Sequence, residues 1–472
     1  MVAIYGEFFM IPNCIKIERT DSMNMKHFKT GILTHKSIIL IPLLGLLTGF
    51  SSAYGQAKEC SPRNGLPNWF SKLNEGAAVR IGYLGGSITC QPGYRVLSRE
   101  WFQQQFPEAT VSEIDAGIGG TGSELGAYRL QQDMLVHKPD LLFIEFAVND
   151  LGRSTEDIIK SMEGIVRQTW NANPETDICF LYTFSEPNLP SLKNNQFPAP
   201  VQAMEQVAAH YGIPSIHMGL HIVKLIQAGK VSLKDPGAMV DDVAGDALNA
   251  LKSEQTDLAK PIPFSKDGVH PYVNTGHQLY MDAIERSMQQ IQTINKPAEK
   301  HSLPEKLNEA CLENAKILPI HPTMLSSGWT QIKPGGPNSY FLNRFQSMWT
   351  ASTPGETLSF TFKGTDCMIY DLMGPDCAKV EVQLDDQPAQ QINRFDPYCT
   401  YYRINTLTVG RGLTNGLHTV RIKILAEQPD RRNILAKRPA NLEKFDQNPE
   451  AYDGTTWSIG GIMILGDLAE QK

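Results

Sequence analysis

Two short segments of the sequence carry side chains that could work together in nucleophilic catalysis. Ser87 lies in the run Leu-Gly-Gly-Ser-Ile-Thr, directly after an apolar stretch, and glycines at such a turn leave a serine hydroxyl exposed. Much later, Asp267 precedes His270 by three residues, a spacing that lets a carboxylate hold an imidazole in one tautomer. Each segment alone also fits a simpler interpretation, a serine that caps a helix and a solvated loop pair. Together they suggest a serine, a base and an acid for acyl transfer.

Two further segments lie between these. The glycine-rich run 116–122 follows the second predicted strand, and Asn149 with Asp150 ends the third. The first run also matches the G-x-G-x-x-G fingerprint of dinucleotide-binding proteins, but that fingerprint normally follows the first strand of its domain. We expect Asp150 to be structural and to cap the turn after Asn149.

In this order the segments resemble the four conserved blocks of the SGNH (GDSL-like) hydrolases: Gly86-Ser87, Gly119-Gly120, Val148-Asn149-Asp150 and the run from Asp267 to His270. The resemblance covers roughly residues 80–286. Two blocks depart from the family pattern: the first reads Gly-Ser-Ile rather than Gly-Asp-Ser, and Ala147 replaces the usual glycine of the third.

The resemblance implies a role for each matching residue. Ser87 would be the nucleophile and His270 the general base, with Asp267 orienting it. The backbone N–H groups of Ser87 and Gly120 and the side-chain amide of Asn149 would form the oxyanion hole, with Gly119 as a substitute for Gly120. Acyl transfer of this kind needs no metal and no cofactor, and we expect none.

The elements that must position these residues alternate between strand and helix. Apolar runs at 79–84, 111–114, 141–148, 178–183 and 213–216 read as strands. Between them, the apolar residues of 158–166 fall on one helical stripe, which Ser154 and Asp157 could cap. This alternation predicts a three-layer α/β/α domain around a parallel sheet over residues 60–294, with chemistry at the carboxyl ends of its strands.

The pattern changes in the last third of the chain. Residues 295–323 are rich in Lys, Glu, Asn and Pro and are predicted to be a linker. From 324 to 472, runs of alternating apolar and polar residues at 358–362, 380–384, 402–409 and 420–424 predict an antiparallel, jelly-roll-like β-sandwich without helices. Its tryptophans and tyrosines could form a sugar-stacking surface, although burial in the sandwich core is the simpler interpretation.

The amino-terminal region predicts export. Lysines at 26, 29 and 36 precede an apolar run at 38–50 and the small residues of 51–55, the order of a secretory signal. The apolar run is shorter than the roughly 20 residues of a membrane span. We therefore interpret residues 1–55 as a signal region with an upstream extension. We expect a periplasmic or extracellular protein without stable membrane insertion.

The net charge and the cysteine content exclude some classes of partner and of site. The net charge of -7 offers no basic field, so nucleic acid is a poor candidate partner. Seven cysteines follow the signal region. The sequence contains no C-x-x-C pair, which disfavours a zinc ribbon and a thioredoxin-like redox site. The sequence fixes neither cysteine pairing nor oligomeric state.

These observations predict a secreted serine esterase that forms an acyl-enzyme. By analogy with exported members of the family that carry an added sandwich, the expected substrates are O-acetyl groups on a polysaccharide or oligosaccharide. Two alternatives stay open: a lipase or thioesterase that uses the same triad, and a carbohydrate-binding protein with an inert α/β unit.

Overall fold

The structure, a computed structural model, describes residues 56–237 and 260–469. The predicted signal region lies outside these residues. The described residues belong to one compact unit. Within the described residues no helix is both long and apolar enough to cross a membrane.

The first sheet has six strands in the order β1-β6-β5-β4-β2-β3. The strands β2 to β6 pair in parallel, and only the two-residue β1 runs antiparallel, against β6. This confirms the predicted parallel sheet. The strands are β1 (Cys60–Ser61), β2 (Ala78–Gly85), β3 (Thr110–Gly117), β4 (Leu141–Glu145), β5 (Asp177–Tyr182) and β6 (Ser215–His217).

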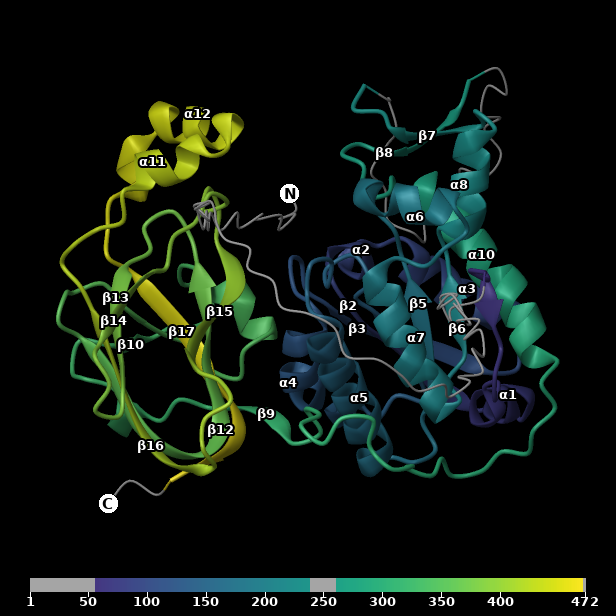
Figure 1. Ribbon diagram of the computed structural model, residues 1–472, viewed down its shortest axis with the longest axis horizontal. Helices are drawn as coiled ribbons and strands as arrows, with labels where there is room; N and C mark the ends of the chain where they lie inside the picture. Colours follow the sequence, from purple (N-terminus) through teal and green to yellow (C-terminus); the bar gives the residue numbers. More distant parts are fainter. Residues whose placement is uncertain (1–55, 238–259, 470–472) are drawn as a thin grey trace, which may run out of the picture. The chain divides into compact units, whose positions relative to one another are not determined.

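Helices cover both faces of this sheet because its strands are apolar on both sides (Figure 1). On β4, Leu141 and Phe143 join the core of one face, and Leu142 and Ile144 join the core of the other. The helices that cover one face are α1 (Pro67–Asn74), α3 (Tyr94–Gln105), α8 (Leu220–Gln227) and α10 (Gly276–Gln292). Those that cover the other face are α4 (Ser123–Asp133), α5 (Thr155–Ala172) and α7 (Ala199–Tyr211). Two short helices, α2 (Ser87–Cys90) and α6 (Leu189–Lys193), belong to the connections between these elements.

The α5 helix follows the predicted stripe. The hydroxyl of Ser154 accepts the backbone N–H of Asp157 at 3.1 Å, as a capping residue does. Ile158, Met162 and Ile165 are buried on its inner side.

The register of the sheet gathers the predicted site at one edge. Gly85 at the end of β2 lies opposite Gly117 on β3 and opposite Glu145 on β4. Because the three strands are parallel, the segments that follow them leave the sheet side by side. A separate parallel pair, β7 (Val231–Lys234) with β8 (Ile262–Ser265), leads into the segment that carries Asp267 and His270.

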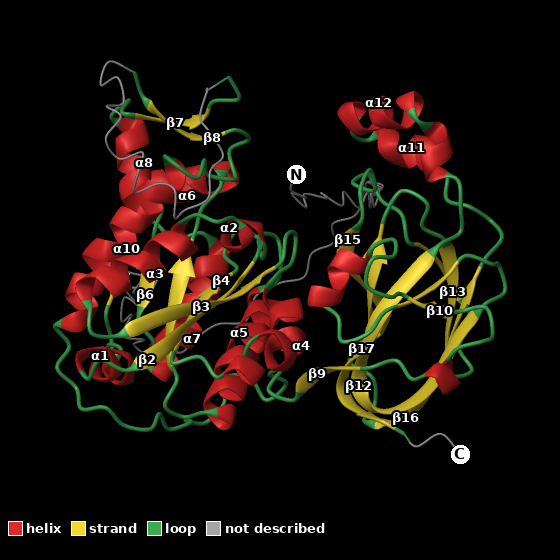
Figure 2. Cartoon of the chain, turned by 180° about the vertical axis from the view of Figure 1, so that it is seen from behind, coloured by secondary structure: helices red, strands yellow, loops and turns green. Residues whose placement is uncertain are grey.

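The second domain is an antiparallel β-sandwich (Figure 2). The long strand β12 pairs with β16 along its first half and with β15 along its second half, so it contributes to both layers. The strands are β9 (Ala315–Leu318), β10 (Thr330–Gln331), β11 (Trp349–Ala351), β12 (Thr357–Met373), β13 (Lys379–Leu384), β14 (Gln390–Asn393), β15 (Arg403–Gly410), β16 (Gly416–Ile424) and β17 (Trp457–Leu468).

Two features of this region differ from the sequence-based expectation. Strand β9 pairs with β17 although it lies inside the predicted linker. Two helices, α11 (Arg431–Ala436) and α12 (Pro439–Gln447), interrupt a domain that was expected to contain strands alone. Asp430 caps α11 by accepting the backbone N–H of Asn433, and Pro439 occupies the first turn of α12, where its missing N–H costs nothing.

The aromatic residues of the sandwich divide between core and surface. Trp329 and Trp457 are buried and meet edge to face with ring centroids 5.7 Å apart. Tyr401 stays partly exposed. The two tryptophans therefore belong to the core rather than to a sugar-stacking surface.

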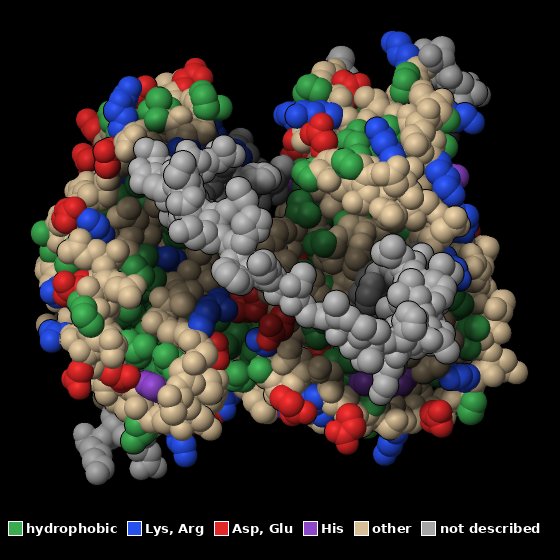
Figure 3. All heavy atoms as spheres, viewed as in Figure 1, with side chains coloured by type: hydrophobic (Ala, Val, Ile, Leu, Met, Phe, Trp, Pro, Cys, Tyr) green, Lys and Arg blue, Asp and Glu red, His purple; other side chains and the backbone are tan. Residues whose placement is uncertain are grey.

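On the face drawn in Figure 3, acidic and basic side chains are interspersed, without a broad patch of one sign.

All seven cysteines of the described residues are free thiols, six of them buried and Cys90 exposed.

Candidate active site

The structure brings Ser87, His270 and Asp267 into one chain of hydrogen bonds. Ser87 is the first residue of α2, and its Oγ lies 3.0 Å from Nε2 of His270. The other ring nitrogen, Nδ1, lies 2.8 Å from Oδ2 of Asp267. Ser87 and His270 are 183 residues apart in the sequence. A hydroxyl, an imidazole and a carboxylate in this order can carry out nucleophilic acyl transfer.

Close packing explains why the turn before Ser87 is glycine-rich. A methyl group on Gly85 would lie 2.1 Å from Oγ1 of Thr89, and one on Gly86 would lie 2.0 Å from Oδ1 of Asn149. Neither position has room for a side chain. The sharp strand-to-helix turn therefore depends on both glycines, and it leaves Ser87 only partly buried.

The loop that carries the acid and the base is held by its own side chains. Oδ1 of Asp267 accepts the backbone N–H groups of Val269 at 3.0 Å and His270 at 2.8 Å. The hydroxyl of Ser265 accepts the N–H of Gly268 at 2.9 Å, and Gly268 has a φ of +83°, which favours glycine. One oxygen of Asp267 therefore shapes the loop while the other faces the ring.

The same contacts keep Asp267 ionised. Burial alone would raise the pKa of its carboxyl, but the hydrogen bonds from the ring and backbone of His270 outweigh burial and hold that pKa below its usual range. The side chain of Asp267 is 44% exposed and that of His270 is 17% exposed. A charged carboxylate thus faces Nδ1 and favours a proton there, which leaves Nε2 free to accept from Ser87.

Of the predicted oxyanion-hole residues, the structure brings Asn149 to the nucleophile turn. Its side chain lies against Gly86, and Gly119 lies beside Ser87, with a methyl group there 3.8 Å from Cβ of Ser87. Gly120 has a φ of +73°, and a methyl group on it would meet no atom within 4 Å. The backbone donor role of Gly120 stays a prediction, with Gly119 as its substitute.

Asp150 is buried beside this turn. Its Oδ1 accepts the backbone N–H of Ser123 at 3.0 Å, at the start of α4. Burial raises the pKa of its carboxyl to about 6. Asp150 therefore connects the turn after β4 with the start of α4. This role is structural, but its side chain bonds α4 and not the turn after Asn149 that the sequence suggested.

Sequence reasoning missed a buried polar cluster beneath the nucleophile turn. Glu145, the last residue of β4, accepts hydrogen bonds from the hydroxyls of Thr89 at 3.1 Å and Thr183 at 2.6 Å. Thr89 is also 2.8 Å from the hydroxyl of Tyr94, which must donate because the Thr89 proton is already used. Burial raises the pKa of Glu145 to about 7. The sequence shows this glutamate only as one polar residue in an apolar strand.

A second missed residue comes from the sandwich. Arg344, which follows the short helical turn Ser339–Asn343, donates to the backbone carbonyls of Asp115 at 2.8 Å and Gly117 at 3.1 Å. Gly117 is the last residue of β3, directly before the loop that contains Gly119 and Gly120. No local sequence signal links an arginine so late in the chain to this strand.

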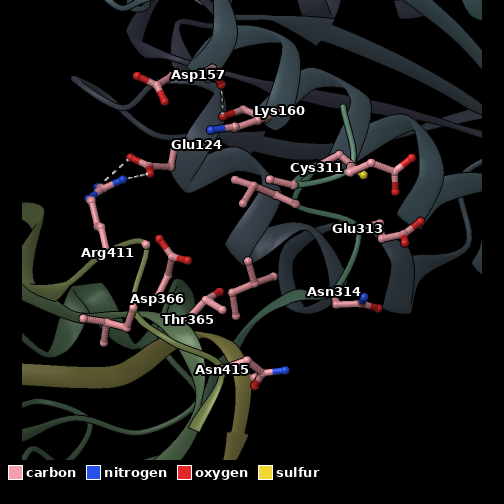
Figure 4. A pocket seen from close by; sticks show the side chains of 18 of the residues that line it. Glu124, Asp157, Lys160, Cys311, Glu313, Asn314, Thr365, Asp366, Arg411 and Asn415 are labelled. Atoms are coloured by element: carbon pink, nitrogen blue, oxygen red, sulfur yellow. Dashed lines mark hydrogen bonds and ion pairs between the residues drawn. The ribbon is translucent and has the colours of Figure 1, made fainter. Parts of the chain in front are cut away.

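A pocket of about 930 Å³ lies away from these residues, along α4 and α5 and against residues 363–366 of β12 and the sandwich loop 411–415 (Figure 4). Ser87 and His270 do not line it. Several of its charged side chains pair with one another: Glu124 bonds both Arg153 and Arg411, and Lys306 bonds Glu313. The pocket therefore contains no arrangement suited to acyl transfer.

His217 and His221, four residues apart in the sequence, lie in different elements. His217 ends β6 and is buried, stacked on Phe197 with ring centroids 5.5 Å apart, and burial lowers its pKa to about 3. His221 lies in α8 and is exposed. Among the described residues, no three histidine, cysteine or acidic side chains group as metal ligands would.

A family model matches most of the α/β domain. Residues 83–272 match the model of the GDSL-like Lipase/Acylhydrolase family, a span that includes every predicted site residue from Ser87 to His270. Over these residues the α/β domain is similar to GDSL-type acylhydrolases, and a sandwich domain follows it in the chain. No curated protein matches the sequence.

Two of the solved structures that resemble this chain match it over both domains. One is a two-domain esterase active on acetylated mannans, co-crystallised with mannopentaose; it is 19% identical, the match covers 88% of this chain and 100% of that one, and the TM-score is 0.62. A second structure described as the same kind of esterase is 20% identical, with 87% and 100% covered and a TM-score of 0.63. At these identities the likeness establishes the shared two-domain fold.

Proposed function

We propose that this protein is an exported serine esterase that removes O-acetyl groups from a polysaccharide or oligosaccharide. The observation that carries the proposal is the hydrogen-bond chain from Ser87 through His270 to Asp267. It joins a nucleophile, a base and an ionised acid at the carboxyl edge of a parallel sheet, where α/β enzymes bind their ligands.

In the proposed reaction, Nε2 of His270 takes the proton from Ser87 as Oγ attacks the acetyl carbonyl. His270 then gives this proton to the sugar oxygen as the ester bond breaks, leaving an acetyl group on Ser87. In the second half of the reaction, His270 takes a proton from water as the water oxygen attacks the acetyl carbonyl, and it gives that proton to Oγ of Ser87 as acetic acid leaves; the acid then loses its proton to solvent and becomes acetate. Asp267 holds the ring in one orientation and stabilises the imidazolium.

The negative charge that develops on the carbonyl oxygen requires donors fixed before the reaction. The proposed donors are the backbone N–H of Ser87 at the start of α2, the backbone N–H of Gly120 and the amide of Asn149. Losing one such donor typically lowers kcat by roughly 10²- to 10³-fold.

The proposed substrate class rests on the shared two-domain fold. The similar solved structures are described as an esterase active on acetylated mannans, so acetylated mannan is the first glycan to test. The family also includes lipases, so an acyl hydrolase of lipase or thioesterase type is the alternative. Export is proposed from the amino-terminal sequence, and fractionation of the producing cells tests it: full-length protein kept in the cytoplasm would contradict it.

The test measures acetate release by the purified protein from acetylated mannan, acetylated xylan and acetylated cello-oligosaccharides. A series of 4-nitrophenyl esters from acetyl to octanoyl measures acyl preference. Ser87→Ala, which deletes one oxygen, serves as the control and should lower kcat by roughly 10⁴-fold or more.

We expect acetate release from at least one glycan and the highest kcat/KM on the acetyl ester. Rates that rise with acyl length would instead favour a lipase. Glycan binding without hydrolysis of any ester would favour the carbohydrate-binding alternative. Full activity of the Ser87→Ala protein would refute the assigned nucleophile.

A further inference from the structure

We propose that Gln91 and His277 form a positioning bridge that holds the loop carrying His270 against the turn carrying Ser87. The proposal rests on the function proposed above and adds two residues to it. Gln91 is the C-cap residue directly after α2, and its backbone N–H donates to the carbonyl of Ser87 at 3.2 Å. Its side-chain Nε2 donates to the carbonyl of Pro271, the residue after His270, at 3.2 Å.

His277 fixes the orientation of the Gln91 side chain. This histidine lies in the first turn of α10 and is fully buried. Its Nδ1 accepts the backbone N–H of Tyr94 at 3.1 Å, so the ring proton must be on Nε2. Nε2 is 3.3 Å from Oε1 of Gln91 and therefore donates to it. With its oxygen turned to the ring, Gln91 presents its NH₂ group to Pro271.

The ring of His277 has almost no freedom to move. A methyl group on Gly93 would lie 2.2 Å from its Cγ, so the ring packs directly on the backbone of that glycine. Tyr94 and Tyr280 flank it, with ring centroids at 5.9 and 6.0 Å. Burial lowers the pKa of His277 to about 3, and the ring stays neutral at any pH suited to an esterase assay.

The bridge acts where the active site needs precision. Asp267 fixes His270 within its own loop, whereas Gln91 ties that loop to the element that carries Ser87. The bridge therefore supports the 3.0 Å separation of Ser87 Oγ and His270 Nε2 without touching substrate. A misplacement of about 1 Å at a reacting pair can cost on the order of 10²-fold in rate.

Two substitutions at the partly exposed Gln91 test this role. Gln91→Met keeps the length of the side chain and removes both amide contacts. Gln91→Glu keeps an acceptor for His277 but cannot donate to Pro271. Gln103→Met is the matched control, because Gln103 also bridges two backbone groups, the carbonyl of Ala109 at 2.8 Å and the N–H of Val111 at 3.0 Å, at the far end of α3.

We expect both Gln91 variants to lower kcat on the acetyl ester by roughly 10- to 100-fold. KM should stay within about twofold, since the bridge does not bind substrate. Their thermal midpoints should match that of Gln103→Met, whose kcat should stay near wild type.

Wild-type kcat in Gln91→Met, a change in KM alone, or an equal loss of kcat in Gln103→Met would overturn the bridge. Failure of the proposed function looks different: the wild-type protein would not hydrolyse acetyl esters, or Ser87→Ala would remain active. An active wild type with unaffected Gln91 variants would refute the bridge alone.

Discussion

Replacing Asp267 by asparagine is a sharp test of the tautomer that the site requires. Oδ1 of Asp267 accepts two backbone N–H groups of its loop, and Oδ2 faces Nδ1 of His270 at 2.8 Å. In Asp267→Asn the amide oxygen can keep the two backbone contacts. The NH₂ group then points at Nδ1 and donates to it, so the ring proton moves to Nε2. Nε2 can no longer accept the proton of Ser87.

The size of the effect follows from this geometry. The equivalent change in a serine protease, with a buried aspartate, lowers kcat by about 10⁴-fold, or about 5.4 kcal/mol in activation free energy. Asp267 is 44% exposed, so water can partly replace the lost interaction. We therefore expect a loss on the order of 10³-fold in kcat. Asp267→Ala lets water accept from Nδ1, and its loss of kcat should be no larger than that of Asp267→Asn.

The assay is kcat for 4-nitrophenyl acetate, measured between pH 6 and 9, with the thermal midpoint as the check on folding. The asparagine variant should stay within a few degrees of wild type, because its loop contacts are retained. If this folded variant kept kcat within about tenfold of wild type, the ring orientation by Asp267 would not matter as argued.

Three further predictions test other contacts. Gly86→Ala places a methyl group 2.0 Å from Asn149 Oδ1 and should lower kcat by roughly 10²-fold with little change in KM; unchanged kcat would exclude the amide as an oxyanion donor. Arg344→Ala releases the carbonyl of Gly117 and should lower kcat by about tenfold, with partial recovery in Arg344→Lys, and equal kcat in all three proteins would contradict this. Burial lowers the pKa of His217 to about 3, so below about pH 6.5 the unfolded state binds a proton that the folded state does not, and the free energy of unfolding falls as the pH is lowered; His217→Gln should remove about 2 kcal/mol of the difference between urea melts at pH 7 and pH 5, and an unchanged difference would contradict the neutral ring.

The parts of the fold that could be predicted are those with a regular pattern. The apolar runs before Ser87 and Asn149 are buried strands, and their parallel pairing follows from the helices between them. The meeting of Ser87 with His270 could be anticipated because strand ends in a parallel sheet gather at one edge. One boundary moved: β4 ends at Glu145, because the N–H of Asp150 bonds the carbonyl of Phe146 in a turn.

The supporting contacts could not be predicted, because they rest on single residues without a pattern. Gln91 and His277 are 186 residues apart, and only the folded chain shows that they bond. Glu145 looks like a strand residue until Thr89 and Thr183 are found beside it. Strand β9 could not be predicted for a similar reason, since its four residues are too few to show an alternating pattern.

The division into two domains shows the same limit at a larger scale. Composition separates an α/β region from a strand-rich region, and the secondary structure follows that division. Packing does not: one apolar core contains Leu125 and Tyr128 of α4 together with Met368 and Tyr370 of β12. Arg344 adds hydrogen bonds from the sandwich to the end of β3. Because composition reports what each segment is made of and not what covers it, a boundary drawn from composition passes through a shared core, and the site depends on residues from both sides of it.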